Sequence, residues 1–65
     1  MKNKIKELRS TIKLSQAELA TICNVSRQTI NAIENDKYDP TLKLAFDIAS
    51  ALHTTVDELF ISEFV

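Results

Sequence analysis

Residues 15–35, SQAELATICNVSRQTINAIEN, decide the fold of this chain. Ser15 stands three residues before Glu18, which is the spacing of a capping box at the start of a helix. Ser26 is a second candidate N-cap, because serine hydroxyls accept hydrogen bonds from the free N–H groups of a first helical turn. Asn24 suits the turn between the helices, since asparagine tolerates positive φ. The segment therefore predicts two short helices joined by a tight turn.

The second of these helices, expected at about 27–35, has an unusual polar face. At about 100° per residue, Ile30 and Ile33 share the side that must pack on the rest of the domain. The other side carries Gln28, Asn31 and Ala32, and Arg27 lies toward one edge; these four are the candidate base-reading residues. Arg pairs with guanine, Gln pairs with adenine, and an Ala methyl can touch a thymine methyl. This pattern predicts a helix-turn-helix that reads the DNA major groove, and a solvated polar face is the alternative.

At this level of detail the chain resembles the phage-repressor type of helix-turn-helix, the Cro/cI or Xre family. The similarity is carried by the runs Ser15–Ala20, Val25–Ile30, Ile33–Asn35, Tyr38–Leu42 and Ala45–Ala49. It extends from Ile5 to Phe60. The resemblance implies an all-α, compact five-helix bundle, one domain over residues 1–65, whose third helix reads DNA.

The resemblance also implies roles for particular residues. It assigns DNA phosphate contacts to Ser15, Gln16, Asn35 and Lys37, with Gln16 also bracing the recognition helix. It places Arg9 against Glu34 as a structural pair between the first and third helices. The family often carries glycine where this chain has Lys13, Asn24 and Asp36, and this chain contains no glycine. Asp36 also puts a negative charge beside the expected phosphate contact.

The flanking segments are interpreted as support for the motif. A first helix is expected from about Lys2 to Ile12. A fourth helix is expected after Pro40, with Leu44 and Ile48 alongside an apolar stripe formed by Leu42, Ala45, Phe46, Ala49 and Leu52. Thr55 and Glu58 have capping-box spacing and predict a last short helix that ends near Phe60.

Composition limits the classes of function. The chain has 65 residues, of which 45% are hydrophobic, and a net charge of −1. Residues 1–33 hold six basic and two acidic side chains, whereas residues 34–65 hold two basic and seven acidic ones, so the basic half contains the motif. No apolar run is long enough to span a membrane, and MKNKIKELRS lacks the apolar segment of a secretory signal. We therefore expect a cytoplasmic protein.

Neither the single cysteine nor the single histidine indicates a chemical site. Cys23 is expected to be a small buried hydrophobe. His53 has no partner at metal-ligand spacing and suits the end of a helix. There is no glycine-rich phosphate loop and no nucleophile with a neighbouring base, so we expect no metal, no cofactor and no enzyme activity.

The carboxyl-terminal segment, residues 55–65, is unusually apolar. An extended tail that pairs with the N-terminal residues and a disordered tail are both compatible with it. We expect an extended or packed tail that forms a homodimer interface, because exposed apolar clusters usually mark contacts. The candidate interface residues are Leu59, Phe60, Ile61 and Phe64.

Two classes of function follow from these observations. The first is a sequence-specific transcriptional regulator, a repressor that binds a palindromic site in double-stranded DNA as a homodimer. The second is an antitoxin-like or other protein-interaction module on the same scaffold, which would bind a second protein tightly and DNA weakly.

Overall fold

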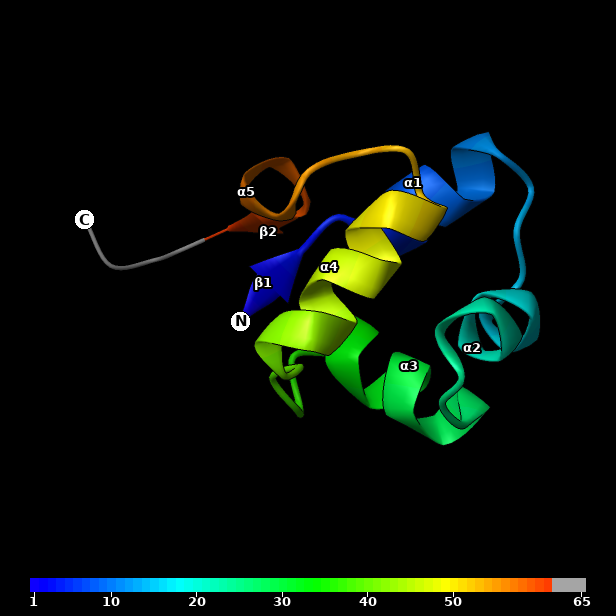
Figure 1. Ribbon diagram of the computed structural model, residues 1–65, viewed down its shortest axis with the longest axis horizontal. Coiled ribbons are helices and arrows are strands. Elements are labelled where there is room, and N and C mark those ends of the chain that lie inside the picture. Colours follow the sequence, from blue (N-terminus) through cyan, green and yellow to red (C-terminus); the bar gives the residue numbers. More distant parts are fainter. Residues whose placement is uncertain (62–65) are drawn as a thin grey trace.

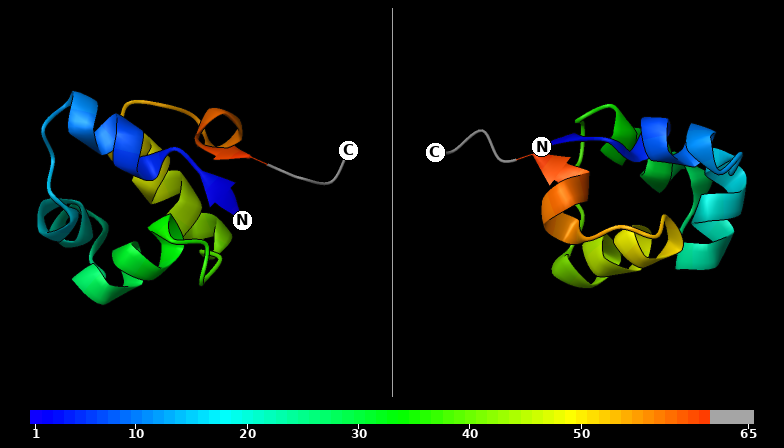
Figure 2. Two further views of the ribbon diagram at one scale, coloured as in Figure 1. Left: turned by 180° about the vertical axis from the view of Figure 1, so that it is seen from behind. Right: turned by 90° about the horizontal axis from the view of Figure 1, so that it is seen from above.

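A computed structural model of the chain describes residues 1–61, and within them five short helices are followed by the second strand of a small sheet (Figure 1). In chain order the elements are β1 (Lys2–Asn3), α1 (Ile5–Thr11), α2 (Gln16–Cys23), α3 (Arg27–Glu34), α4 (Leu42–Ala51), α5 (Val56–Leu59) and β2 (Phe60–Ile61). Helices α2 and α3 lie at one end of the molecule, and α5 lies with the strand pair at the other (Figures 1 and 2). The prediction of a five-helix bundle is confirmed.

The predicted starts of α2 and α3 are confirmed. The hydroxyl of Ser15 accepts from the N–H of Glu18 at 3.0 Å, and the carboxylate of Glu18 accepts from the N–H of Ser15 at 2.9 Å. The hydroxyl of Ser26 accepts from the N–H of Thr29 at 3.1 Å. Because each cap pairs N–H groups that the helix itself leaves without a partner, these bonds fix where the two helices begin.

Helices α1 to α4 all end in the same left-handed turn. A residue with a positive φ follows each helix, directly at Asn24 (58°) and one residue further on at Lys13 (56°), Asp36 (59°) and His53 (58°). In every case the next N–H bonds back to the carbonyl five residues earlier, as when Val25 donates to Ala20 at 3.0 Å. This is the helix ending that glycine usually provides. The expectation for Asn24 is confirmed, and His53 is a fourth such position that the sequence did not indicate.

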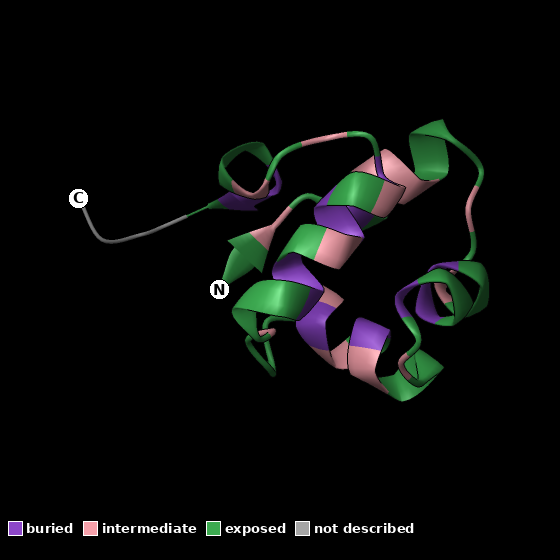
Figure 3. Ribbon diagram, in the orientation of Figure 1, coloured by how far each residue is buried: buried purple, intermediate pink, exposed green. Residues whose placement is uncertain are grey.

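One hydrophobic core joins all five helices. Its fully buried large side chains are Ile5, Leu19, Ile30, Ile33, Ile48 and Leu59, and every helix contributes at least one of them. Figure 3 shows these buried positions on the inner sides of the helices. Each such side chain contributes about 1.5–3 kcal/mol by leaving water. Cys23 is buried in the same core, as predicted.

The first helix begins later than predicted. Lys2 and Asn3 form β1, which pairs antiparallel with β2 in the register Lys2 to Ile61 and Asn3 to Phe60. The side chain of Asn3 also accepts from the N–H of Ile5 at 3.1 Å, next to the start of α1. Pairing with the N-terminal residues, one of the two alternatives for the tail, therefore occurs at residues 60 and 61.

The interface predicted for the tail requires correction. Leu59 is 0% exposed and Phe60 is 7% exposed within the single chain, so neither is available to a second molecule. They are buried because α5 turns back onto the core and the Leu59 carbonyl accepts from the Lys4 N–H at 2.9 Å. Ile61 is 41% exposed, and Phe64 lies outside the described residues.

Two further expectations are met only in part. In the predicted stripe of α4, Ala45, Ala49 and Leu52 are buried, as are Leu44 and Ile48 beside it, but Leu42 and Phe46 are 70% and 58% exposed. Thr55 makes no capping bond to a backbone N–H. Its hydroxyl donates instead to the Glu58 carboxylate at 2.9 Å.

Candidate nucleic-acid interface

Helix α3 presents most of the predicted base-reading residues to solvent. Arg27, Gln28 and Asn31 are exposed, whereas Ala32 is only partly so. The opposite side of the helix is held in the core by Ile30 and Ile33, which are 0% and 1% exposed. The apolar anchors thus fix the rotation of α3, whose ribbon has a buried and an exposed side (Figure 3). The exposed side carries hydrogen-bonding groups and one positive charge.

The four predicted phosphate-contacting residues lie at the ends of the two motif helices. Ser15 and Gln16 stand at the start of α2, whereas Asn35 and Lys37 follow α3. Lys37 is exposed, and so is its neighbour Asp36. The carboxylate of Asp36 accepts a hydrogen bond of 3.4 Å from the side-chain amide of Asn3. An exposed carboxylate therefore remains next to Lys37, as the sequence indicated.

Gln16 connects the two motif helices through its side chain. Its Nε2 donates to Oδ1 of Asn31 at 3.1 Å and to Oε1 of Glu34 at 3.2 Å. Its Oε1 accepts from Nε of Arg27 at 3.5 Å. The amide of Asn35 donates to Oδ1 of Asn31 at 3.2 Å and to the Asn31 carbonyl at 2.9 Å. Several predicted DNA contacts therefore belong to one hydrogen-bonded group before any DNA is present.

Arg9 and Glu34 form a nearly buried ion pair beneath this group. Nε of Arg9 donates to Oε2 of Glu34 at 2.7 Å, and Nη2 donates to Oε1 at 3.1 Å. The Arg9 and Glu34 side chains are 13% and 5% exposed. Arg9 also donates to the carbonyl of Leu14 at 2.8 Å. Two parallel bonds to one carboxylate hold the planar guanidinium in one orientation, so this pair ties α1 to the end of α3.

The resemblance implied that Gln16 braces the recognition helix, but the sequence did not identify its partners Asn31 and Glu34. These residues are 15 and 18 positions from Gln16, and no local pattern indicates such a pairing. The bond from the Asn3 amide to the carbonyl of Ile33, at 2.9 Å, is a second example. Both connections depend on how the helices are placed against each other.

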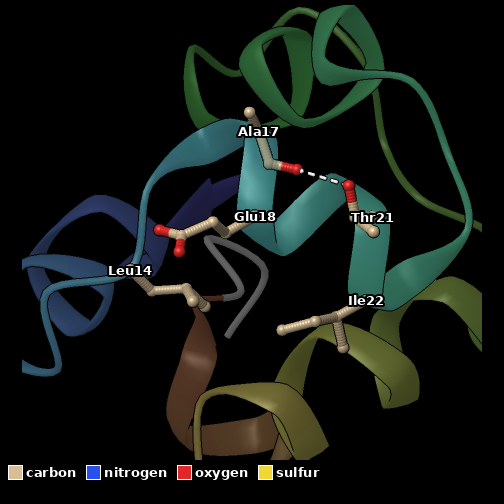
Figure 4. Close-up of a pocket in the computed structure, with 5 residues that line it drawn as sticks. All are labelled: Leu14, Ala17, Glu18, Thr21 and Ile22. Atoms are coloured by element: carbon tan, nitrogen blue, oxygen red, sulfur yellow. Dashed lines mark hydrogen bonds between the residues drawn. The ribbon is translucent and has the colours of Figure 1, made fainter.

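A shallow pocket on α2 has a different character from the α3 face. It is lined by Leu14, Ala17, Glu18, Thr21 and Ile22 (Figure 4). The hydroxyl of Thr21 donates to the Ala17 carbonyl at 3.0 Å.

The hydrogen bonds from the backbone and hydroxyl of Ser15 lower the pKa of Glu18. The charged Glu18 carboxylate thus accepts the capping hydrogen bond from the Ser15 N–H at the start of α2.

Two more titratable groups are perturbed, and both lie near α4. Burial, and then the charge of Asp47, raise the pKa of the Cys23 thiol. The hydrogen bond to Asp47 raises the pKa of Lys43. Within residues 1–61, no group of three or more His, Cys, Asp or Glu side chains is placed to hold a metal ion. In that same stretch no helix is long and apolar enough to cross a membrane.

Comparison with known sequences gives two consistent matches. The helix-turn-helix family model matches residues 5–59. An uncharacterized HTH-type transcriptional regulator of Methanocaldococcus jannaschii is 52% identical over 63 residues, which are 97% of this chain and 96% of that protein.

Comparison with solved structures identifies the same fold. The restriction-modification controller protein of Aeromonas hydrophila superposes with a TM-score of 0.81 at 30% identity, over 88% of this chain and 86% of that one. The DNA-binding domain of the P22 c2 repressor superposes with a TM-score of 0.79 at 26% identity, over 83% of this chain and 71% of that domain.

Proposed function

Because this chain belongs to the helix-turn-helix family of transcriptional regulators, we propose that it is a repressor that binds a palindromic operator as a homodimer. The observation that carries the proposal is the exposed face of α3. There Arg27, Gln28 and Asn31 stand on a helix whose other side is fixed in the core. Long polar side chains on a rigid helix can reach base edges in the major groove, which admits an α-helix.

Phosphate contacts would hold the protein in register on the duplex. Ser15, Gln16, Asn35 and Lys37 flank α3 at the ends of the two motif helices. Contacts of this kind position a protein without carrying sequence information. The half of the chain that contains α2 and most of α3 carries the positive charge that attracts the DNA backbone. A protein with this role would reside in the cytoplasm with the DNA.

The exposed apolar surface formed by α4 and α5 supports the homodimer. We define this surface by Leu42, Phe46 and Val56, and refer to it below as the α4–α5 surface. Leu42 and Phe46 are one helical turn apart and are 70% and 58% exposed. Both belong to shallow hollows that Val56 also lines. A second copy on this surface would bury these side chains and place two recognition helices on one face of the duplex, about 34 Å apart.

Repression in particular is supported by the similarity of the fold to the DNA-binding domain of the P22 c2 repressor. A reporter assay tests this part of the proposal. The operator selected in vitro is placed across a promoter and, separately, upstream of it. We expect the protein to lower expression in the first arrangement, and higher expression in both would instead indicate an activator.

In vitro selection from a random duplex pool tests the function as a whole. We expect enrichment of two half-sites related by two-fold symmetry, with centres about 10 base pairs apart or a multiple of that spacing. A single half-site would overturn the homodimer but keep the regulator. No enrichment at low salt, together with tight co-purification of another small protein, would instead favour the protein-interaction module.

A further inference from the structure

The hydrogen-bonded group around Gln16 determines which end of the Asn31 amide faces DNA. The orientation is set first at Glu34. Its carboxylate can only accept hydrogen bonds, and two hydrogen bonds from Arg9 hold it in place. The Gln16 amide must therefore turn its nitrogen, not its oxygen, toward Glu34. Oxygen and nitrogen of such amides are assigned from their partners, and here the partner is unambiguous.

The same nitrogen of Gln16 then sets the orientation of Asn31. Nε2 of Gln16 has two hydrogens, of which one goes to Glu34 and the other to Oδ1 of Asn31. The amide nitrogen of Asn35 approaches the same Asn31 oxygen at 3.2 Å. A flipped Asn31 would turn its own N–H groups toward these two donors and would lose both hydrogen bonds. The acceptor of Asn31 is therefore occupied within the protein.

The remaining group of Asn31 is its Nδ2, which carries two N–H donors. Among residues 1–61 no acceptor receives a hydrogen bond from this nitrogen, and Asn31 is exposed. We propose that Asn31 acts on DNA only as a hydrogen-bond donor and reads guanine or thymine rather than adenine, with Gln16 as its positioning residue. This inference rests on the proposed function.

Because the four bases present different donors and acceptors in the major groove, a donor-only Asn31 prefers some bases over others. Asparagine usually pairs with adenine in two ways at once, by donating to N7 and accepting from the N6 amino group. Asn31 has no free acceptor for the second bond, so the adenine amino group would face a donor. Guanine offers two acceptors, O6 and N7, and thymine offers O4. Cytosine presents an amino donor and is disfavoured for the same reason as adenine.

A measurement without DNA tests the orientation of the amides. In nuclear magnetic resonance spectra of the ¹⁵N-labelled protein, the side-chain N–H groups of Gln16 should exchange with solvent more slowly than those of Asn31. The reverse order would overturn the proposal. This outcome does not depend on whether the protein binds DNA, so it separates the inference from the proposed function.

In vitro selection with variants tests the readout. The position whose base preference is lost in Asn31→Ala should be guanine or thymine in the sites selected by the parent, preferred over adenine by about tenfold. Gln16→Met removes one of the two donors that hold the Asn31 oxygen and leaves only the bond from Asn35, so discrimination against adenine should weaken at that position. The preference ratio is informative even if Gln16→Met weakens binding overall.

Thr21→Met is the control, because Thr21 is exposed on α2, the helix that begins at Gln16, and its hydroxyl donates to the Ala17 carbonyl rather than to Asn31. It should leave the Asn31-dependent position unchanged. A preference for adenine or cytosine at that position in the parent, or no base preference that depends on Asn31, would overturn the proposal. If the parent enriches no sequence at all, the proposed function fails, and the exchange measurement still decides the orientation of Asn31.

Discussion

The Arg9–Glu34 ion pair is almost out of contact with water, whereas the Lys43–Asp47 pair lies on the surface. The side chains of the first pair are 13% and 5% exposed, and those of the second are 86% and 38% exposed. Water screens the exposed pair, and an exposed pair one helical turn apart contributes about 0.3–0.5 kcal/mol. Removing one partner of a buried pair leaves a charge without compensation and costs about 3–5 kcal/mol when burial is complete.

Arg9→Met should therefore lower the melting temperature clearly, because Glu34 would keep its charge in a nearly buried position. Lys43→Met is the matched control, since it removes a cation from an exposed pair, and it should change the melting temperature little. Thermal unfolding followed by circular dichroism compares the two variants with the parent. Equal melting temperatures for Arg9→Met and the parent would show that the pair does not hold α1 to α3.

Arg27 and Lys37 should differ in how their loss affects DNA binding. Arg27→Ala should cost about 1–3 kcal/mol on the preferred site and relax discrimination at one base position. Lys37→Ala should weaken all sequences alike and reduce the salt dependence of log K by about one. Titration of specific and random duplexes at several salt concentrations measures both effects. An equal loss on random DNA for Arg27→Ala would mean that Arg27 contacts only phosphate.

At the scale of single helices, the start of α2 depends on the charge of Glu18. Its pKa is lowered by the hydrogen bonds from Ser15, so the folded chain favours the ionised carboxylate. A lowered folded pKa gives stability that is complete above the unfolded pKa, about 4.3 for glutamate, and that is lost as the pH falls through the folded value. The chain therefore loses this stability as the pH falls below about 4.3.

Glu18→Gln should lose less stability than the parent as the pH falls below about 4.3, because glutamine fills the same capping position without titrating in this range. Glu7→Gln removes another exposed carboxylate from the first turn of a helix and serves as the control. Melting temperatures measured between pH 2 and pH 6 test the difference. If the parent and Glu18→Gln lose stability in parallel over that interval, the cap does not depend on the Glu18 charge.

The ends of α1 to α4 depend on left-handed residues that are not glycine. A left-handed backbone costs a residue with a Cβ roughly 1–2 kcal/mol, and asparagine tolerates it better than most. Glycine avoids this cost but loses about 0.5–1 kcal/mol in backbone entropy. His53→Gly should therefore raise the stability by up to about 1 kcal/mol, whereas Asn24→Gly should change it less. Chemical denaturation gives both values, and a destabilised His53→Gly would show that the histidine side chain has a role in the folded state.

At the scale of the whole molecule, the two ends of the bundle have different surfaces. The end with α2 and α3 is polar and hydrogen-bonded, whereas the α4–α5 surface is apolar and exposed. One chain thus carries a face suited to DNA and a separate face suited to protein. Because these faces lie on different helices, changes to one should leave the other intact.

Phe46→Lys should convert the proposed homodimer to a monomer, since it places a charge at the centre of the α4–α5 surface. Ile22→Lys is the matched control, because Ile22 is 59% exposed and Phe46 is 58% exposed, and Ile22 lies on α2 instead. Sedimentation at micromolar concentration, with and without operator DNA, measures the mass. A 7.3 kDa monomer for the parent under both conditions would contradict the homodimer.

The sequence by itself determined the motif helices because their signals are local. The caps at Ser15 and Ser26 join groups three residues apart, and the turn at Asn24 is closed by a bond from Val25 to Ala20. Such bonds depend only on neighbours in the chain, so residue types at fixed spacing are enough to predict them. Helical periodicity likewise placed Gln28 and Asn31 on the exposed side of α3, opposite two buried isoleucines.

Only the tertiary structure decided which apolar side chains remain outside and which way the amide of Asn31 points. Leu59 and Phe46 are both large apolar residues near the carboxyl end, yet Leu59 is buried and Phe46 is exposed. The orientation of Asn31 depends on Gln16, 15 residues earlier, and through it on Glu34 and Arg9. These outcomes are set by how complete helices are positioned against one core, and contacts between distant segments leave no periodic signal in the sequence.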